Sequence, residues 1–353
     1  MMGGERRVST SSGTFEHFPV VAFVTLVSLA IYLFFLPASV YWLDSPEFMS
    51  AAAKLALPHP PGHPVAVLLM KFFMMLPIGD VPFRANLFGA FFGALSAGMV
   101  AGISKVVAVA TLRRIGYFRW RPTSKPGAGR NAGEVEPAGL DDSVLFRPAT
   151  FLALCSGFMF AGCRSMFIQS MAAEVYTLNA ALLLGALYGL MSGKAGDARR
   201  GMAAGVLLGL ALANHHFLAL LCVPALVVAF WVDLRSSLKP LLAIALVSVL
   251  TALGCYMYVA VRGAGDAWPA WGRITGVGDF LWYVSASIFS QSVGGFEQTG
   301  GGPLKNLALA ISLIGTTMGL ASIWIAFLGN WFAARCGVLR HAFSLALLFL
   351  GGL

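Results

Sequence analysis

The chain has 353 residues, of which 58% are hydrophobic and only 11% are charged. This composition excludes an ordinary soluble domain, and several apolar runs reach the ~20 residues that a helix needs to cross a bilayer. The formal net charge of +9 does not indicate nucleic-acid binding, because the basic residues are dispersed in short loops between apolar runs. We therefore expect an all-α, polytopic integral membrane protein whose partners include the lipid bilayer and no nucleic acid.

A cytoplasmic N-terminal tail at 1–17 precedes a membrane domain at 18–353, in which the apolar runs predict about eight or nine spans. The run at 201–213 is too short to cross a bilayer unaided, so we expect the Asn-His-His turn at 214–216 to lie inside a cavity. The sequence stops at Leu353 inside an apolar run, so we expect it to be truncated at the C-terminus. The expected spans cover approximately residues 18–36, 81–112, 148–168, 176–191, 201–213, 217–231, 241–261, 307–332 and a run from 343.

The basic residues predict the orientation of these spans. With the N-terminus in the cytoplasm, the inner loops hold 16 of the 24 Lys and Arg residues, and the largest is a flexible, Gly- and Pro-rich loop at 113–147. Two long loops, at 37–80 and 262–303, then lie on the outer side. Four of the six histidines and most of the candidate acids fall on this side, where one cavity could collect them.

The first outer loop contains the stretch YWLDSPEFMSAAAKLALPHPPGHP at 41–64. Pro46 suits the first turn of a short amphipathic helix lying along the membrane surface, with Asp44 or Ser45 as its cap. Asp44 and Glu47 are the candidate catalytic acids. A helix cap and a charge that complements the helix dipole explain the same two residues without catalysis.

The prolines at 58–64 follow this helix and forbid a second one, so we expect His59 and His63 to lie on a stiff, extended support. Acids and imidazoles held at a membrane boundary predict a proton-transfer site, to which Asp44 and Glu47 supply the carboxylates. The alternative is that the prolines form only a re-entry turn.

Glu174 and Tyr176 lie in AAEVYTLN between two apolar runs, where an ionised carboxylate costs about 2.5–3.5 kcal/mol at membrane depth. We therefore expect Glu174 to be functional or paired, with Arg164 as a candidate partner, unless water at the interface solvates it. His215 and His216 are candidate substrate-binding residues on the same side.

Arg262 and Trp271 belong to an aromatic loop that follows the run at 241–261. They predict a groove for a sugar or a lipid phosphate, although interfacial Trp anchoring and a snorkelling Arg explain the same pattern. No metal is expected, since the chain has no ExxH or CxxC spacing, and its five cysteines are expected to be unpaired, small buried hydrophobes.

Six motifs, taken together and in this order, resemble one family. It is the bacterial membrane group catalogued as domain of unknown function 2723, which is akin to the eukaryotic transmembrane O-mannosyltransferase acting on plexin-type receptors. The resemblance covers about residues 20–291. The motifs are DSPEF at 44–48, LPHPPGHP at 57–64, GDVPFRANLFGAFFGA at 79–94, AAEVYTLNA at 172–180, LANHH at 212–216 and WG…FLWYVS at 271–285.

This resemblance implies a GT-C-like helix bundle in the bacterial inner membrane, with an active site facing the periplasm. The implied activity is transfer of a monosaccharide, by analogy mannose, from a polyprenyl-phosphate donor to a hydroxyl of a protein or glycan, without a cofactor. Asp44 matches the catalytic acid of the first outer loop, Glu47 would assist it, and His59 begins the recurring His-Pro-Pro element. Pro46 and His63 stand where the family usually has Gly and Tyr, which leaves the donor's identity open.

Two other functional classes use the same residues. A proton-coupled transporter or lipid-linked sugar flippase would use the buried acids and histidines as a proton relay, but the two halves of the chain show no matching pair of broken helices. A noncatalytic assembly subunit is the third class. Convergence of Asp44, His59 and Glu174 on one cavity that opens toward lipid favours the transferase.

Overall fold

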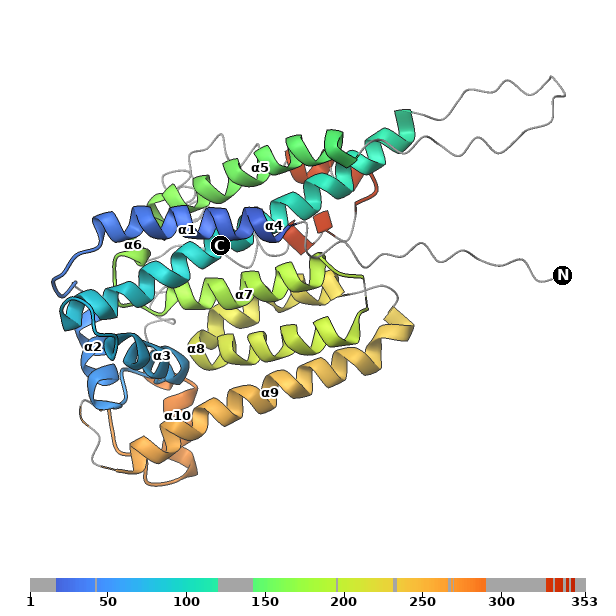
Figure 1. Cartoon of the computed structure of the whole chain (residues 1–353). Helices are drawn as coiled ribbons and strands as arrows, with labels where there is room; N and C mark the ends of the chain where they lie inside the picture. Colours follow the sequence, from blue (N-terminus) through green and yellow to red (C-terminus); the bar gives the residue numbers. More distant parts are fainter. Residues whose placement is uncertain are drawn as a thin grey trace, which may run out of the picture.

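Among the residues that the computed structural model describes, the regular elements are all helices, and there is no strand (Figure 1). The described residues are 17–41, 43–119, 142–194, 196–230, 234–265, 268, 270–289, 328–332, 334–338, 341–342 and 344–346. The elements in order are α1 (Phe18–Phe35), α2 (Ser45–Lys54), α3 (Pro64–Met74), α4 (Val81–Arg119), α5 (Asp142–Gly162), α6 (Arg164–Ser170), α7 (Tyr176–Met191), α8 (Ala198–Phe230), α9 (Leu234–Ala264), α10 (Val277–Val284) and the short 3₁₀ helix η1 (Ser287–Phe289).

By length and composition, α1, α4, α8 and α9 are each able to cross a membrane, and the bent pair α5–α6 raises the number to five among the described residues. The chain is therefore an all-α, multi-pass membrane protein. The expected continuous span at 148–168 is wrong, because the helix breaks at Cys163 and α6 leaves α5 at 64°. Most of the runs expected at 307–332 and from 343 lie outside the described residues.

Helix α8 is a hairpin of two antiparallel arms. His215 has φ −154° and ψ 87°, which no α-helix contains. The N–H of Gly196 donates to the carbonyl of Phe230 at 3.0 Å, whereas the ends of a straight 33-residue helix would lie about 50 Å apart. The two short runs predicted around the Asn-His-His turn are thus confirmed, and α8 does not cross a membrane as one straight helix.

The loop expected at 113–147 is helical at both ends, so that prediction is too wide. Helix α4 continues to Arg119 and α5 begins at Asp142, before Pro148. Nothing in the sequence from 113 to 119 breaks a helix, and the Asp-Ser pair at 142–143 suits a helix start better than the later proline does.

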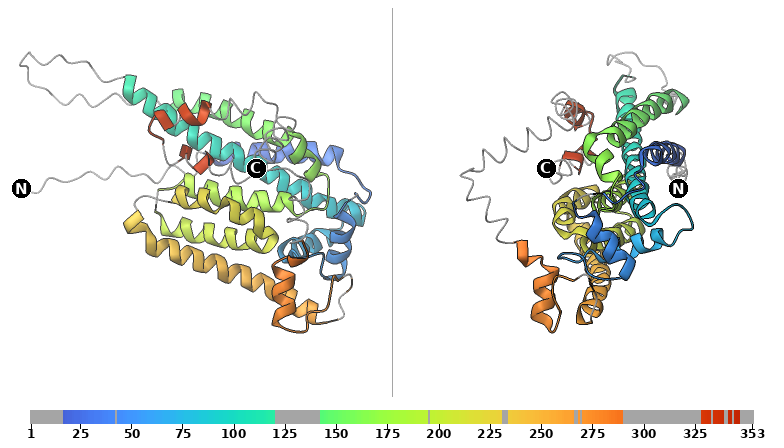
Figure 2. Two further views of the ribbon diagram at one scale, coloured as in Figure 1. Left: turned by 180° about the vertical axis from the view of Figure 1, so that it is seen from behind. Right: turned by 90° about the vertical axis from the view of Figure 1, so that its left-hand side faces the viewer.

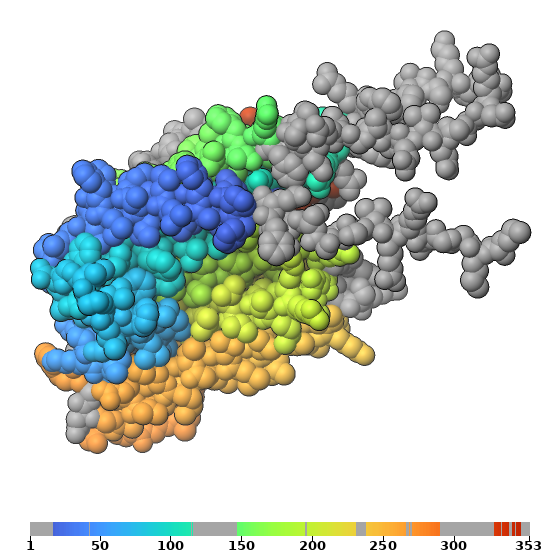
Figure 3. Space-filling model, viewed as in Figure 1, coloured from blue at the N-terminus to red at the C-terminus, as the bar shows by residue number. Residues whose placement is uncertain are grey.

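The long helices lie side by side, and the short helices gather at one end of them. In Figures 1 and 2, α2, α3 and α10 lie near the last turns of α1 and α9, while the end of α4 and the start of α5 lie at the opposite end. Small residues allow the close packing: a Cβ on Gly98 of α4 would collide with Thr25 of α1. The space-filling view shows the α2–α3 segment meeting the α9–α10 segment at the same end (Figure 3).

Candidate active site

Asp44 and Glu47 begin α2 as the sequence predicted, but their side chains have different surroundings. Pro46 stands in the first turn and Asp44 occupies the N-cap position, yet its carboxylate makes no capping hydrogen bond. Asp44 is exposed to a pocket at the bundle end. The interpretation of Asp44 as a mere helix cap therefore has no support from its contacts.

Glu47 accepts three hydrogen bonds from two other segments. Its Oε1 accepts from the backbone N–H of His59 and from Nε1 of Trp271, both at 2.6 Å, and its Oε2 lies 2.9 Å from Nδ1 of His59. Burial alone would raise the pKa of Glu47, but the bonds from His59 and Trp271 outweigh it and lower that pKa. Glu47 is thus a fixed anion that holds α2 and the turn after it to the segment after α9.

The same contact positions His59 and favours its charged form. Burial disfavours its charged form, but the hydrogen bond to Glu47 and the charge of Glu47 outweigh burial and raise the pKa of His59. Since Nδ1 faces Glu47, the other ring nitrogen, Nε2, is the one available to the pocket that His59 lines. This geometry presents an imidazolium N–H to a ligand.

The backbone that carries His59 and His63 forms a tight turn, so the prediction of an extended segment is wrong. The N–H of Gly62 donates to the carbonyl of His59, and His63 has a left-handed φ of 39°. Tertiary contacts impose this turn: the hydroxyl of Tyr283 donates to Pro58 O at 2.5 Å, and that of Tyr258 donates to Ala56 O at 3.0 Å.

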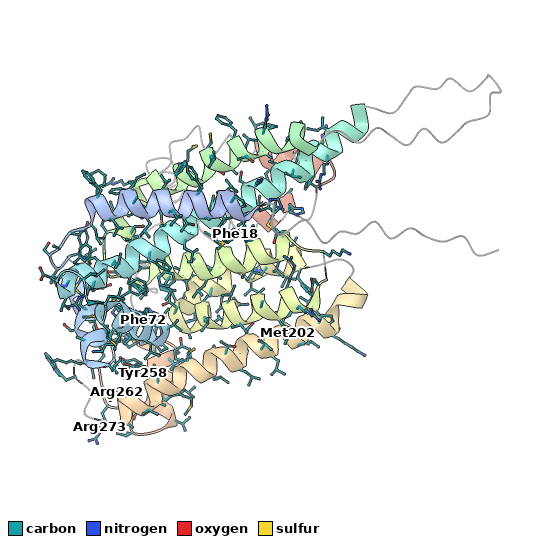
Figure 4. All side chains as sticks on the ribbon, in the orientation of Figure 1. Phe18, Phe72, Met202, Tyr258, Arg262 and Arg273 are labelled. Carbon is teal, nitrogen blue, oxygen red and sulfur yellow. The ribbon has the colours of Figure 1, made fainter. Side chains whose placement is uncertain are left out.

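Arg262 holds the same segment and does not line the pocket. Its Nε donates to Leu55 O at 2.5 Å and its guanidinium to Lys54 O at 3.4 Å, so it caps the C-terminal end of α2. Figure 4 shows Tyr258 and Arg262 close together at this end of α9. Neither the predicted phosphate contact nor snorkelling to headgroups describes the position of this side chain.

His63 joins the turn to the break in α8. Its Nδ1 lies 2.5 Å from the backbone oxygen of Asn214, and its ring packs edge-on against Phe48 and His59. The side chain of Asn214 in turn donates to the carbonyl of Val175, in the loop before α7, at 2.9 Å. Three segments distant in sequence are thereby fixed around one pocket.

Glu174 is buried in the loop between α6 and α7, with Oε2 unpaired among the described residues. Burial and then the nearby charge of Asp44 raise the pKa of Glu174 to about 7. The expected partner is wrong, because Arg164 is exposed at the start of α6 and forms no ion pair with it.

The segments described above enclose one cavity of about 100 Å³. It has room for a few water molecules and is smaller than the pockets that enclose whole ligands, so it encloses only part of a substrate. Seven of the ten predicted site residues line it, and Glu47 and Trp271 lie directly behind His59. The lining residues are Asp44, Phe48, His59, Pro60, Pro61, His63, Glu174, Val175, Tyr176, His215, His216, Phe217, Ala286 and Phe289.

Comparison with known sequences identifies the family. The family model described as protein O-mannosyl-transferase TMEM260 N-terminal domain matches residues 44–239, more than half of the chain. The chain belongs to this family. The mouse (Mus musculus) protein O-mannosyl-transferase TMEM260 is 39% identical over 72 residues, which make up 20% of this chain and 10% of the mouse protein. No solved structure matches the chain.

The TMEM260 N-terminal domain match begins at Asp44 and includes every predicted pocket residue up to His216. It ends before Arg262 and Trp271, and also before Phe289, which lines the pocket and was not predicted. The family match is narrower than the resemblance expected over 20–291.

Asn214 was recognised only as part of a turn, although it is fully buried and its backbone oxygen accepts from His63. Its place before two histidines in a short gap between apolar runs was the available signal. No sequence signal pointed to Phe289, because its ring reaches His59, at 6.1 Å between ring centroids, only through tertiary folding.

A metal was not expected, yet Asp44, Glu47 and His59 bring ligand-type atoms within 4.8 Å of one another. Both oxygens of Glu47 already accept hydrogen bonds, and the donor to Oε2 is Nδ1 of His59, another member of the cluster. A cation would have to displace these bonds, so the cluster is organised by its own hydrogen bonds.

Proposed function

We propose that this protein is a GT-C-type membrane glycosyltransferase that moves a monosaccharide, mannose, from a polyprenyl-phosphate carrier to a hydroxyl group of a protein. One observation carries the proposal: Asp44, with no capping hydrogen bond, shares a pocket with His59, whose ring is held by Glu47. Such a transfer requires a base for the acceptor proton and a cation for the leaving phosphate.

In the proposed reaction, the acceptor hydroxyl attacks the anomeric carbon of the sugar while Asp44 takes the hydroxyl proton. The new carbon–oxygen bond forms as the bond between that carbon and the phosphate oxygen breaks, and the electron pair leaves with the polyprenyl phosphate. The imidazolium of His59 stabilises the growing phosphate charge, because charge-assisted hydrogen bonds to phosphate are strong. His215 and His216 line the same pocket and supply further donors.

The contacts of Asp44 and Glu47 assign a different role to each acid. Glu47 accepts three hydrogen bonds and its pKa is lowered, so it is a poor proton acceptor and acts as the positioning residue for His59. Asp44 is therefore the proposed base. Tyr176 and the aromatic rings around it supply a surface for the sugar.

The proposed setting is the inner membrane of a bacterium, with the pocket on the periplasmic side. The excess of Lys and Arg in the loops of the opposite end supports this orientation. Nucleotide sugars are held in the cytoplasm, so a lipid carrier would have to bring the sugar to this side.

Asp44→Asn tests the proposal. The variant keeps the shape of the side chain and removes the base, so transfer from polyprenyl-phosphate mannose by the purified protein should fall by ~10²–10⁴. Asp80→Asn is the matched control: Asp80 is also an exposed acid directly before a helix with Pro at its second position, but it does not line the pocket.

Two results would contradict the proposal. If Asp44→Asn retains activity within a few-fold of wild type, the base lies elsewhere. If the protein transfers sugar from a soluble nucleotide sugar with no lipid intermediate, the proposed donor is wrong.

A further inference from the structure

Four side chains that line the pocket each have a buried polar atom with no hydrogen-bond partner among the described residues: Nε2 of His63, Oε2 of Glu174 and Nδ1 of both His215 and His216. His63 and Glu174 are the most deeply buried of the four, with exposed fractions of 2% and 6%. A buried polar atom without a partner costs about 1–3 kcal/mol. Most such atoms in native proteins are paired, so four of them in one cavity indicate partners that a ligand supplies.

The contact with Asn214 decides what His63 offers. A backbone oxygen can only accept, so Nδ1 of His63 carries the proton and donates to Asn214 O. Burial and then the neighbouring His59 charge lower the pKa of His63 well below its usual value, which keeps the ring neutral. A neutral ring protonated at Nδ1 has its lone pair at Nε2, so His63 presents a buried acceptor.

Glu174 complements this acceptor. With a pKa of about 7, its carboxyl group retains a proton in a large fraction of molecules near neutral pH and is then able to donate as well as accept. Its surroundings include Asp44 and Glu47 from α2, His59 from the turn and Tyr176 from α7.

We propose that His63 and Glu174, the inner wall of the pocket, bind hydroxyl groups of the transferred sugar, with a sugar hydroxyl donating to Nε2 of His63. The ligand's identity rests on the proposed function. A hydroxyl suits the wall because it both donates and accepts, whereas a phosphate diester has no proton to donate to Nε2 of His63. Phe48 and Phe289 line the same cavity and add apolar contacts for the sugar ring.

Conservative variants separate the two nitrogens of His63. In His63→Asn the amide nitrogen replaces Nδ1 and keeps the bond to Asn214 O, but nothing replaces Nε2. We expect its KM for polyprenyl-phosphate mannose to rise about 10- to 100-fold, the loss of one buried hydrogen bond, with little change in thermal unfolding. His17→Asn is the matched control, because His17 is also a buried histidine but is the N-cap of α1, at the end of that helix away from α2 (Figure 1).

Donor analogues that each lack one hydroxyl identify the group that His63 binds. For the wild type, one deoxy analogue should lose about 10- to 100-fold in kcat/KM, and the same analogue should lose little further in His63→Asn. Equal losses in both proteins for every analogue would overturn the proposal, and so would wild-type kinetics in His63→Asn. Glu174→Gln keeps a donor and an acceptor and should lose less than Glu174→Ala.

A binding measurement decides the inference separately from the transfer reaction. In protein labelled with ¹⁵N-histidine, Nε2 of His63 should be unprotonated, and methyl mannoside at saturation should shift its resonance, with no such shift in His63→Asn. If the wild type transfers no lipid-linked sugar but shows this shift, the proposed function fails and the hydroxyl subsite stands. A protonated Nε2, or a resonance unchanged by the mannoside because only water occupies the wall, overturns the subsite.

Discussion

The environment of each carboxylate, more than its residue type, assigns its role. Glu47 lies in the first turn of α2 and Asp44 directly before it, yet Glu47 accepts three hydrogen bonds and Asp44 makes no capping bond. Glu174, the third acid, is buried, and its pKa of about 7 keeps it protonated in a large fraction of molecules near neutral pH. A candidate base and a partly protonated acid thus line the pocket, with a fixed anion behind it, and neighbouring groups set the state of each.

Glu47→Gln should move the pH dependence of transfer. The variant removes the charge that raises the pKa of His59, so burial then dominates and the imidazolium loses its proton at lower pH. The alkaline limb of the kcat/KM profile should shift to lower pH, with activity best preserved in acid. An unchanged profile would show that the charge on His59 does not assist the reaction.

Glu174→Gln should change stability in a pH-dependent way. The pKa of Glu174 rises from 4.5 to about 7 on folding, so the folded state binds more protons and the free energy of unfolding falls as pH increases through this window. The shift corresponds to on the order of 3 kcal/mol, all of it lost above pH ~7. Relative to wild type, the variant should therefore be more stable at pH 8 than at pH 5. Denaturant unfolding in detergent at both values measures this difference.

At the scale of elements, α9 acts as the anchor of the segment from α2 to the turn at 58–63. Tyr258 and Arg262, one turn apart, donate hydrogen bonds to the carbonyls of residues 54–56, and Tyr283 beyond α9 donates to the carbonyl of Pro58. The segment that contains Asp44 and His59 is therefore shaped by a helix about 200 residues later in the chain.

Arg262→Ala should destabilise this loop. It removes charge-assisted bonds to the end of α2, so we expect a loss of about 1.5–3 kcal/mol in stability and faster amide exchange at residues 55–56. Val261→Ala, at an exposed neighbouring position of α9, is the control. Stability equal to wild type, together with weaker use of lipid-linked donor, would favour the phosphate contact that the sequence suggested.

Helix-start preferences and the lengths of apolar runs correctly predicted two features of the fold. The start of α2 follows from Pro46, and the break in α8 follows from two apolar runs too short to be separate spans. The turn at 58–63 and the direction of Arg262 were not predictable, because both depend on hydrogen bonds to segments more than 200 residues away. The group of pocket residues was predictable as a set, whereas their individual contacts were not.

At the scale of the whole molecule, the hairpin in α8 determines which loops share a side of the membrane. Because its arms are antiparallel, Arg199 at the start of the first arm and Lys239 near the start of α9 should lie on the same side, and Ser50 of α2 on the other. Single cysteines at these exposed positions, in a background without the five native cysteines, test this by labelling with an impermeant reagent. Opposite sides for 199 and 239 would mean that α8 crosses once.

The contact between Trp271 and Glu47 also has a consequence for where the protein can be divided. The family match ends at residue 239. The side chains that donate hydrogen bonds to Glu47, to the end of α2 and to the carbonyls of residues 56 and 58 all come after it: Trp271, Arg262, Tyr258 and Tyr283. A protein trimmed to 44–239 would keep Asp44, His59, His63 and Glu174 and lose four of the side chains that hold their loop in place. Substitutions after residue 239 are therefore expected to lower the proposed transfer activity, although all of its proposed reacting groups lie before that residue.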